Sequence, residues 1–518
     1  MTWRGSLLLA LLGLGLATLV SRMQSLPGYL DSDYYFAGGL QLAEGKGFSE
    51  PYLWNYLDDP LGLPHPSHAY WMPLASVVAA GGMWITGRAT YAAGRLGFLL
   101  LAALVPPATA ALGYSFSRRR DLALISGLLA VFSVYYAPFM PVPDNYGLYI
   151  LLGATYFFAM SWRRNLSYAF LGLIAGLLAL ARSDGILWLG LTLVLIAVRA
   201  SGASTLGSGS NRVRPAIVQC FLALAGFILI MGPWYWRNYS VFGALLAPGG
   251  GHLLWLKNYD ETFAYPASQI TLASWLSQGW QAIIASRLVA LRWNLLNAFA
   301  AQGGIFLAPF ILLALWHFRK DDRVQISALG WLALLLVMTA VFPFAGYRGG
   351  FFHSGAALQA VWWVLAPLGL DLTVGAARRR GLFTPAAFRV FQSSLVGLAV
   401  LMTGVIIAIR VLPGWGGEEQ DYLRVEAFLK QSGIQRADVV MVRNPPGYYL
   451  MTGQPAVVVP YSDADMMWAA ATRYHARYVI LEQAGVTGPI QKVYDDLSSP
   501  HFAYLGELDG TRVFRVQP

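Results

Sequence analysis

The chain has 518 residues, of which 57% are hydrophobic and only 12% are charged, and its formal net charge is +10. Soluble domains carry about a quarter charged residues, so this composition excludes a single soluble core and indicates a membrane protein. The positive charge does not indicate nucleic-acid binding, because the sequence holds no basic stripe with interleaved aromatic residues. The only cysteine, Cys220, excludes an intrachain disulfide and a CxxC metal site, and is expected to be a small buried hydrophobe.

The N-terminal segment predicts the first membrane span. Arg4 precedes an apolar run from Leu7 to Val20, a pattern shared by signal peptides and uncleaved spans. No small-x-small cleavage site follows the run, which favours an uncleaved span with a cytoplasmic N-terminus. The next apolar stretch, 70–86, contains Pro73 and two tryptophans suited to the headgroup boundary, and is expected to be an interfacial helix within an outer loop of residues 23–95.

Basic clusters between the later apolar stretches mark the cytoplasmic side, because short basic loops are hard to translocate. They are Arg118-Arg119-Arg120, Arg163-Arg164, Arg212 with Arg214, Arg319-Lys320 and Arg378-Arg379-Arg380. With 70–86 lying along the membrane, every cluster falls on the cytoplasmic side without further adjustment. The pattern predicts about eleven spans in the cell (plasma) membrane, with the C-terminus outside.

Acidic residues gather in the predicted outer segments, and Asp31 and Asp33 lie two residues apart shortly after the first span. Two carboxylates at a membrane surface can accept a proton and help to hold a divalent cation. The plainer alternative is a solvated pair at the start of a helix, where aspartate is favoured. Asp144 occupies the next outer turn.

The C-terminal part has a different composition: residues 411–518 hold 9 basic and 12 acidic residues, whereas residues 1–410 hold 27 and 14. Short strand-like runs occur at 439–442, 456–459 and 478–481, and alternate with helical patterns at 421–431, 464–476 and 489–498. Asp509-Gly510 between two apolar runs predicts a hairpin turn. The expected fold is an all-α polytopic membrane domain over 1–410, followed by a small extracytoplasmic α/β domain over 411–518 that supports it.

An ordered set of short motifs resembles the GT-C glycosyltransferases, which use polyprenyl-phosphate sugars. The set comprises Asp31 with Gly45 fourteen residues later, His65-Pro66-Ser67-His68 before the interfacial helix, Asp144, Leu180-Ala181-Arg182-Ser183-Asp184-Gly185, and Pro233-Trp234-Tyr235-Trp236-Arg237-Asn238. The motifs are most similar to those of the protein mannosyltransferases and aminoarabinose transferases. Each is degenerate, but their order runs through residues 1–410.

This resemblance implies a single inverting displacement in which Asp31 takes the acceptor proton, with Asp33 as the second catalytic candidate. A lipid phosphate leaves, and its charge needs a cation. The implied substrate-binding residues are Asp144, His65, His68, Arg182, Arg237, Tyr347, Arg348 and His353; Asp31, Asp33 and Asp144 are the ligands expected for an optional Mg²⁺ or Mn²⁺. The implied partners are a polyprenyl-phosphate-linked sugar donor, the lipid bilayer and an unidentified acceptor, without nucleic acid.

The motifs also depart from these relatives. Asp31-Ser32 stands where they tend to have Asp-Glu, His-Pro-Ser replaces Lys-Pro-Pro, and the Trp-Trp-Asp motif of oligosaccharyltransferase catalytic subunits is absent from the sequence. The sugar and the acceptor therefore stay open. For single residues such as Arg182 and Arg237, anchoring of a span at the headgroups is as good an explanation as catalysis. The competing functions are a membrane transporter or lipid flippase, and a scaffold that displays its C-terminal tail.

Overall fold

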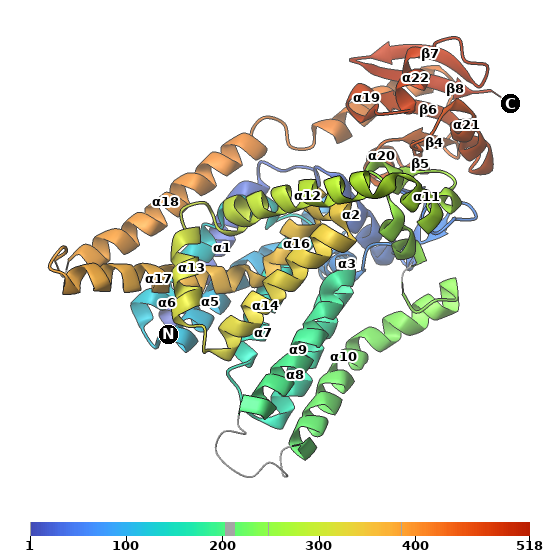
Figure 1. Ribbon diagram of the computed structural model, residues 1–518. Coiled ribbons are helices and arrows are strands. Elements are labelled where there is room, and N and C mark those ends of the chain that lie inside the picture. Colours follow the sequence, from blue (N-terminus) through green and yellow to red (C-terminus); the bar gives the residue numbers. More distant parts are fainter. Residues whose placement is uncertain (1, 203–212, 247, 385, 518) are drawn as a thin grey trace.

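The computed structural model describes residues 2–202, 213–246, 248–384 and 386–517. A bundle of helices forms the larger part, and a small mixed sheet with its helices lies beside one end of the bundle, at the C-terminus (Figure 1). The helices of the bundle are α1 (Trp3–Ser21), α5 (Leu96–Ser117), α6 (Arg120–Val131), α7 (Asn145–Ala159), α8 (Asn165–Ala181), α9 (Ile186–Gly202), α10 (Val213–Phe242), α13 (Ala308–His317), α14 (Asp322–Leu336), α17 (Gln359–Arg379) and α18 (Ala387–Arg410).

Seven helical segments of the described chain are long and apolar enough to cross a membrane. They are Trp3–Ser21, Tyr91–Ser117, Ser183–Ser201, Arg214–Phe242, Asp322–Val341, Pro343–Arg379 and Ala387–Arg410. The four shorter helices α6, α7, α8 and α13 contribute to the same buried core, through side chains such as Leu129, Tyr149, Leu171 and Ala314. The chain is therefore a multi-pass membrane protein, and the count of eleven spans stays a prediction.

Small residues allow the helices of the bundle to approach closely. A Cβ atom on Gly172 of α8 would lie 1.9 Å from the carbonyl oxygen of Ala223 in α10, and one on Gly369 of α17 would lie 2.0 Å from that of Phe310 in α13. Such contacts replace the hydrophobic driving force that helices lack inside a lipid bilayer. Only glycine fits at these crossings.

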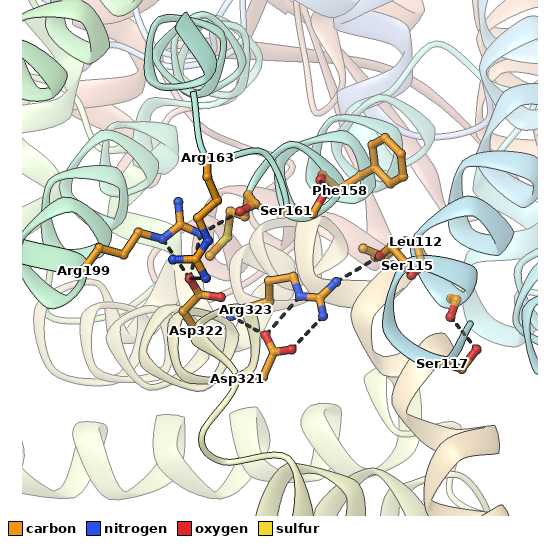
Figure 2. Close-up of polar contacts among 12 residues, drawn as sticks. Leu112, Ser115, Ser117, Phe158, Ser161, Arg163, Arg199, Asp321, Asp322 and Arg323 are labelled. Atoms are coloured by element: carbon orange, nitrogen blue, oxygen red, sulfur yellow. Dashed lines mark hydrogen bonds and ion pairs between the residues drawn. The ribbon is translucent and has the colours of Figure 1, made fainter. Parts of the chain in front are cut away.

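Ion pairs join several predicted cytoplasmic loops at one end of the bundle (Figure 2). Asp322, at the start of α14, accepts a hydrogen bond from Arg199 Nε of α9 at 2.7 Å, forms an ion pair with that guanidinium, and lies 3.5 Å from Arg163. Arg323 donates to the Ser115 hydroxyl of α5 at 2.9 Å. The basic loops around these residues therefore share one end of the bundle, as the charge pattern predicts for loops on one side of a membrane.

Three basic clusters remain: 118–120, 378–380, and Arg212 with Arg214. Arg119 forms a 2.8 Å ion pair with Asp371, two turns before the last basic cluster at the end of α17. Arg212 lies outside the described residues, and Arg214 lies in the first turn of α10.

The first outer segment folds around two packed helices, α2 (Leu30–Ala43) and α3 (Leu74–Thr86). A Cβ atom on Gly39 would lie 2.7 Å from the Ala79 side chain, so their backbones nearly touch. The expected helix within 70–86 is present, and its C-terminal turn exposes Trp84 and Ile85. Its position at the membrane interface stays a prediction. The two-residue strands β1 (Ser49–Glu50) and β3 (His65–Pro66) pair antiparallel between these helices, and α4 (Tyr91–Gly94) follows them.

The C-terminal sheet has six strands in the order β2-β5-β4-β6-β8-β7. The strands at 439–442, 456–459 and 478–481 are confirmed as β4 (Val439–Val442), β5 (Ala456–Val458) and β6 (Ala476–Glu482), and the hairpin is confirmed as β7 (Phe502–Leu508) and β8 (Thr511–Val516). Asp509 and Gly510 both have positive φ, as a two-residue hairpin turn requires. The helices are α19 (Gly417–Gln431), α20 (Pro445–Thr452), α21 (Ala464–Arg473) and α22 (Ile490–Asp495).

One edge strand of this sheet comes from the first outer segment. β2 (Tyr52–Leu53) pairs parallel to β5, with Tyr52 opposite Ala456. The connecting segment 248–278, with α11 (Leu272–Ser277), also reaches the sheet domain, where the Tyr461 N–H donates to the Phe263 carbonyl at 3.0 Å. α12 (Gly279–Asn297) follows and extends across the top of the bundle in Figure 1. The sheet is therefore attached to the membrane part through several segments of the chain.

Candidate active site

Three side chains from distant segments meet beside a cavity. Asp31 Oδ2 lies 3.6 Å from His353 Nε2, and Asp144 Oδ1 lies 3.8 Å from His353 Nδ1. One ligand atom from each residue lies within 4.8 Å of the others. The Asp144 side chain is completely buried, whereas 29% of the Asp31 side chain is exposed. Asp31 is therefore the carboxylate that a ligand can reach.

Each of the three residues sits at a helix end. Asp31 occupies the first turn of α2, and Asp144 is the N-cap of α7, where its Oδ1 accepts the Asn145 N–H at 2.5 Å. Carboxylates are favoured at both positions because helix N-termini leave N–H groups free. His353 belongs to α16 (Phe351–Gly355), just after Gly349, whose φ of 130° breaks the preceding helix.

Two tyrosines hold this group. The Tyr29 hydroxyl donates to Asp144 Oδ2 at 2.5 Å, and the Tyr146 hydroxyl lies 2.7 Å from His353 Nε2. The rings of Tyr146 and His353 are stacked, with centroids 4.2 Å apart. No pattern in the sequence marks Tyr29, which directly precedes α2, or Tyr146, which follows Asp144 by two residues, as functional. Their hydroxyls fix the two less accessible members of the group.

Burial controls the charge of the two carboxyl groups. It raises the pKa of Asp31 to about 7; the nearby Asp144 raises it too, and the guanidinium of Arg182 opposes this rise. Burial also raises the pKa of Asp144, against the hydrogen bonds from Tyr29 and the Asn145 N–H. A carboxylate with a raised pKa is a better general base near neutral pH than an ordinary surface aspartate.

The adjoining cavity has a volume of about 580 Å³ and two chemically different walls. Asp31, Arg182, Arg348 and His353 supply charged or polar groups. Side chains of α9, of α10 and of the segment after α14 supply an apolar wall, which includes Ile186, Leu187, Met231, Val337, Met338 and Phe342. Such a cavity suits a ligand with an anionic head and a hydrocarbon chain.

The two arginines differ in how firmly they are held. Arg182 donates from Nε to Asp184 at 3.0 Å and its side chain is 16% exposed. Arg348 lies over the Tyr259 ring, 4.9 Å from the centroid, and is exposed. Arginine binds phosphate oxygens in a bidentate manner, and both guanidinium groups lie at the cavity wall.

The donor set of Asp31, Asp144 and His353 fits a divalent cation. Two carboxylates and one imidazole suit Mn²⁺ or Zn²⁺ better than Mg²⁺, which prefers oxygen ligands throughout. Within the described chain, the buried His353 Nδ1 has no hydrogen-bond partner, so this nitrogen is available as a ligand.

Asp33 lies apart from this group, although the sequence analysis paired it with Asp31. Its Oδ2 accepts a 2.8 Å hydrogen bond from Asn444 Nδ2 of the C-terminal domain. Residues two apart on a helix point to opposite faces, because each residue turns the helix by about 100°. Asp31 and Asp33 both lie in α2 and therefore point away from each other. Asp31 faces Asp144, and Asp33 lies on the other side of the helix.

The two histidines of the first outer segment also lie elsewhere. His65 Nε2 is 3.0 Å from Asp58, and its Nδ1 is 3.5 Å from Glu50. Burial lowers the pKa of His65, but these two carboxylates raise it by more, to about 9. The ring of His68 is held between the hydroxyls of Ser67 and Ser76, and burial lowers its pKa to about 3. Neither histidine is among the residues that line the cavity.

Neither Arg237 nor Tyr347 is among the residues that line the cavity. Arg237 donates to the Ser67 carbonyl at 2.8 Å and lies over the Trp234 ring at 4.9 Å. Tyr347 packs edge-on against Phe344, with centroids 6.4 Å apart. Of the residues expected to bind substrate, Asp144, Arg182, Arg348 and His353 are the ones that the structure brings to the Asp31 site.

Comparison with known proteins identifies the fold. No protein-family model and no curated protein sequence matches the chain. Among solved structures, the oligosaccharyltransferase of Archaeoglobus fulgidus in complex with Zn and sulfate is similar, with a TM-score of 0.60 and 12% identity over 97% of this chain and 72% of that one. AglB of the same organism, in complex with an inhibitory peptide and a dolichol-phosphate, has a TM-score of 0.52 and 11% identity over 92% and 70%.

The ArnT of Cupriavidus metallidurans bound to undecaprenyl phosphate is similar along nearly the whole of both chains. Its TM-score is 0.58 at 11% identity, over 98% of this chain and 97% of that one. Identities this low show the fold alone. The chain therefore has the fold of the GT-C glycosyltransferases, and the resemblance inferred from the sequence motifs is confirmed at that level.

Proposed function

We propose that this protein is an integral-membrane glycosyltransferase that moves a sugar from a polyprenyl-phosphate donor to an acceptor in the cell envelope, which is a glycan, a lipid or a protein. The observation that carries the proposal is the Asp31 carboxylate, which reaches a cavity with arginines at one wall and hydrocarbon side chains at the other. The undecaprenyl phosphate bound to ArnT and the dolichol-phosphate bound to AglB, two proteins of the same fold, support a lipid-linked donor.

In the proposed reaction, Asp31 accepts the proton of the acceptor group as that group attacks the anomeric carbon. A single displacement inverts the configuration at this carbon and needs one base, which Asp31 supplies. The bond to the lipid phosphate breaks, and Arg182 and Arg348 stabilise the charge that develops on the phosphate oxygens. The apolar wall holds the polyprenyl chain. The buried Asp144 lies 3.8 Å from His353 Nδ1, and the Tyr146 hydroxyl holds that ring in place.

Asp31, Asp144 and His353 would hold a divalent cation in this site. A bound cation would supply positive charge beside the phosphate leaving group. Its test is chelation: EDTA is expected to abolish transfer in isolated membranes, and added Mn²⁺ is expected to restore it. Full transfer in the presence of EDTA would leave Arg182 and Arg348 as the cationic groups of the site.

The function is tested by deleting the gene and then expressing the wild-type chain or a variant in the deletion strain. Mass spectrometry of membrane lipids and glycans identifies the product that disappears on deletion and returns with the wild-type chain. Asp31→Asn is expected to lower formation of this product by about 10²- to 10⁴-fold, the usual contribution of a general base. The matched control is Glu44→Gln on the same outer segment, whose carboxylate pairs with Lys46 at the surface.

An Asp31→Asn protein that reaches the membrane and transfers sugar at the wild-type rate would refute the assignment of the base. The alternative function, transport or lipid flipping, predicts movement of solute or lipid into sealed vesicles with no new glycosylated product.

A further inference from the structure

The segment that carries Asp31 is fastened from the C-terminal side at several points. The Trp415 indole N–H donates to the carbonyls of Leu26 and Pro27, at 3.0 and 3.1 Å. The Gly28 N–H donates to Glu419 Oε1 at 2.6 Å. A Cβ atom on Gly28 would lie 2.2 Å from the Trp415 indole nitrogen, and its φ of +92° favours glycine, so only glycine fits this contact. The chain leading into α2 is thus held before the helix begins.

The helix itself is held in the same way. Asn444, the N-cap of α20, donates from Nδ2 to Asp33 Oδ2 at 2.8 Å. At the other end of α2, Gln41 donates from Nε2 to the Tyr449 hydroxyl at 2.9 Å. A Cβ atom on Gly447 would lie only 2.9 Å from Asp33 Oδ2, so the α20 backbone closes directly over this carboxylate.

These contacts lead to both carboxylates of the site. Asp33 follows Asp31 by two residues in the first turn of α2, so any rotation of that turn moves both side chains. Tyr29 packs edge-on against Trp415, with ring centroids 5.8 Å apart, and donates to Asp144. The C-terminal residues therefore constrain Asp31 through the helix, and Asp144 through Tyr29.

The polar groups of this interface cost free energy to bury. Asp33 and Glu419 are 0% and 1% exposed, and each has one carboxylate oxygen without a hydrogen-bond partner in the described chain. A pair of apolar side chains would hold two surfaces together at less cost, because an unpaired buried polar group is unfavourable. Stability therefore does not explain why Asp33 and Glu419 are buried here. Their hydrogen bonds are directional and hold the turn that carries Asp31, which is a role that apolar side chains cannot fill.

We propose that Asn444 and Glu419 are positioning residues, through which the C-terminal domain sets the orientation of Asp31 and Asp144 without touching the substrate cavity. This inference rests on the proposed function and extends it, because it makes the domain part of the catalytic apparatus. A misplacement of the base of about 1 Å is enough to lower the rate roughly 100-fold. Loss of the hydrogen bond from Asn444 to Asp33 would allow the first turn of α2 to move and would misplace Asp31 in this way.

The sharpest variant is Asn444→Asp in the full-length chain. The new side chain keeps its size and its Oδ1, which accepts the Gly447 N–H and caps α20. It replaces the donor that faces Asp33 with a second acceptor, so the two carboxylates repel each other. The reciprocal swap, Asp33→Asn with Asn444→Asp, restores one donor and one acceptor. Gln491→Ala, in an exposed contact of the same domain, is the control.

Initial rates are measured in membranes supplied with the polyprenyl-phosphate lipid extract of the deletion strain, titrated to saturation. Asn444→Asp is expected to lower the maximal rate roughly 10- to 100-fold, as a misplaced base would. The amount of extract that gives half-maximal rate is expected to stay the same, because the cavity is intact. The reciprocal swap is expected to recover most of the rate. Glu419→Ala is expected to lower the rate, whereas Glu419→Gln, which keeps the acceptor for the Gly28 N–H, retains most of it.

A wild-type maximal rate for Asn444→Asp, or a swap that folds and stays as slow as the single variant, would overturn the inference. If Asn444→Asp fails to accumulate in the membrane, equal rates for Glu419→Ala and Glu419→Gln would overturn it instead. Asp31→Asn separates the two proposals. An inactive Asp31→Asn beside a fully active Asn444→Asp refutes only the positioning role. A fully active Asp31→Asn refutes the assignment of Asp31 as the base, and a deletion that removes no glycosylated product refutes the proposed function.

Discussion

Tyr29→Phe is the most selective test of how the buried carboxylate is held, because it removes one oxygen atom. The lost hydroxyl donates to Asp144 Oδ2 at 2.5 Å, a distance typical of a hydrogen bond to a charged acceptor. The ring is expected to stay in place, because its edge contacts with Phe139 and Trp415, at 5.7 and 5.8 Å, do not involve the hydroxyl. The substitution therefore perturbs Asp144 with little change in shape.

Hydrogen bonds to charged groups contribute about 1.5–3 kcal/mol. Since about 1.4 kcal/mol corresponds to a factor of ten, complete loss of this contribution lowers the transfer rate by roughly 10- to 150-fold. Asp144 keeps its second hydrogen bond, from the Asn145 N–H at 2.5 Å, so the lower half of this range is expected. The Asp144 carboxylate is then free to move relative to His353 and Asp31.

The assay compares product formation in membranes that contain equal amounts of wild-type chain, Tyr29→Phe and a control. The control is Tyr136→Phe, which removes a buried hydroxyl that donates to the Phe352 carbonyl at 3.3 Å and does not contact a carboxylate. Tyr136→Phe is expected to keep nearly the wild-type rate. Equal rates for the two variants would refute the reasoning, because the Tyr29 hydroxyl would then have no special role at Asp144.

Two further predictions concern stability. Asp322→Asn is expected to lower the free energy of unfolding by about 1–3 kcal/mol, because it removes the ion pair with the nearly buried Arg199 and weakens the hydrogen bond from its Nε. A lower melting temperature in detergent checks this, and substitution of the exposed Arg163 is expected to have little effect. Burial raises the pKa of Glu482 to about 8, so the folded protein keeps this proton where the unfolded chain, with a pKa near 4.3, loses it. The stabilisation is complete below the unfolded pKa and is lost as the pH rises towards 8. Glutamine carries no titrating proton, so in Glu482→Gln the melting temperature is expected to fall less between pH 5 and pH 8 than in the wild type. An equal fall in both proteins would refute this cause.

The sequence predicts the C-terminal strands well and their edge partner not at all. β4, β5 and β6 are rich in β-branched and apolar residues, so the local sequence is enough to predict them. β2 is two residues long, and its pairing with β5 joins positions about four hundred residues apart. The pairing of β2 depends on tertiary packing, and two residues are too few to show the alternating pattern that predicts a strand.

The site shows the same division between local and long-range information. The charge pattern assigns Asp31, Asp144 and His353 to one side of the membrane, but it carries no information on which of them meet. Helical periodicity could have separated Asp31 from Asp33. Once residues 30–43 form a helix, these two side chains must point in different directions. Tyr29 and Tyr146 act through hydroxyl groups whose hydrogen-bond partners come from other segments or from a kinked helix, and the sequence has no pattern that marks such contacts.

The cost of this arrangement argues that the carboxylates serve chemistry. Asp31 and Asp144 share a poorly solvated site, which raises the pKa of both groups and disfavours their charged forms. The fold could place apolar side chains there at less cost, and the neighbouring core of the bundle does so. The surrounding groups partly offset the cost of burying these charges. Tyr29 and the Asn145 N–H donate to Asp144, and Arg182 stabilises both carboxylates electrostatically. Proteins tend to retain such costly polar groups where binding or catalysis requires them. Replacing both carboxylates by asparagine should therefore leave the folded protein at least as stable as the wild type while transfer is lost. A double variant that unfolds would instead assign the pair to the fold.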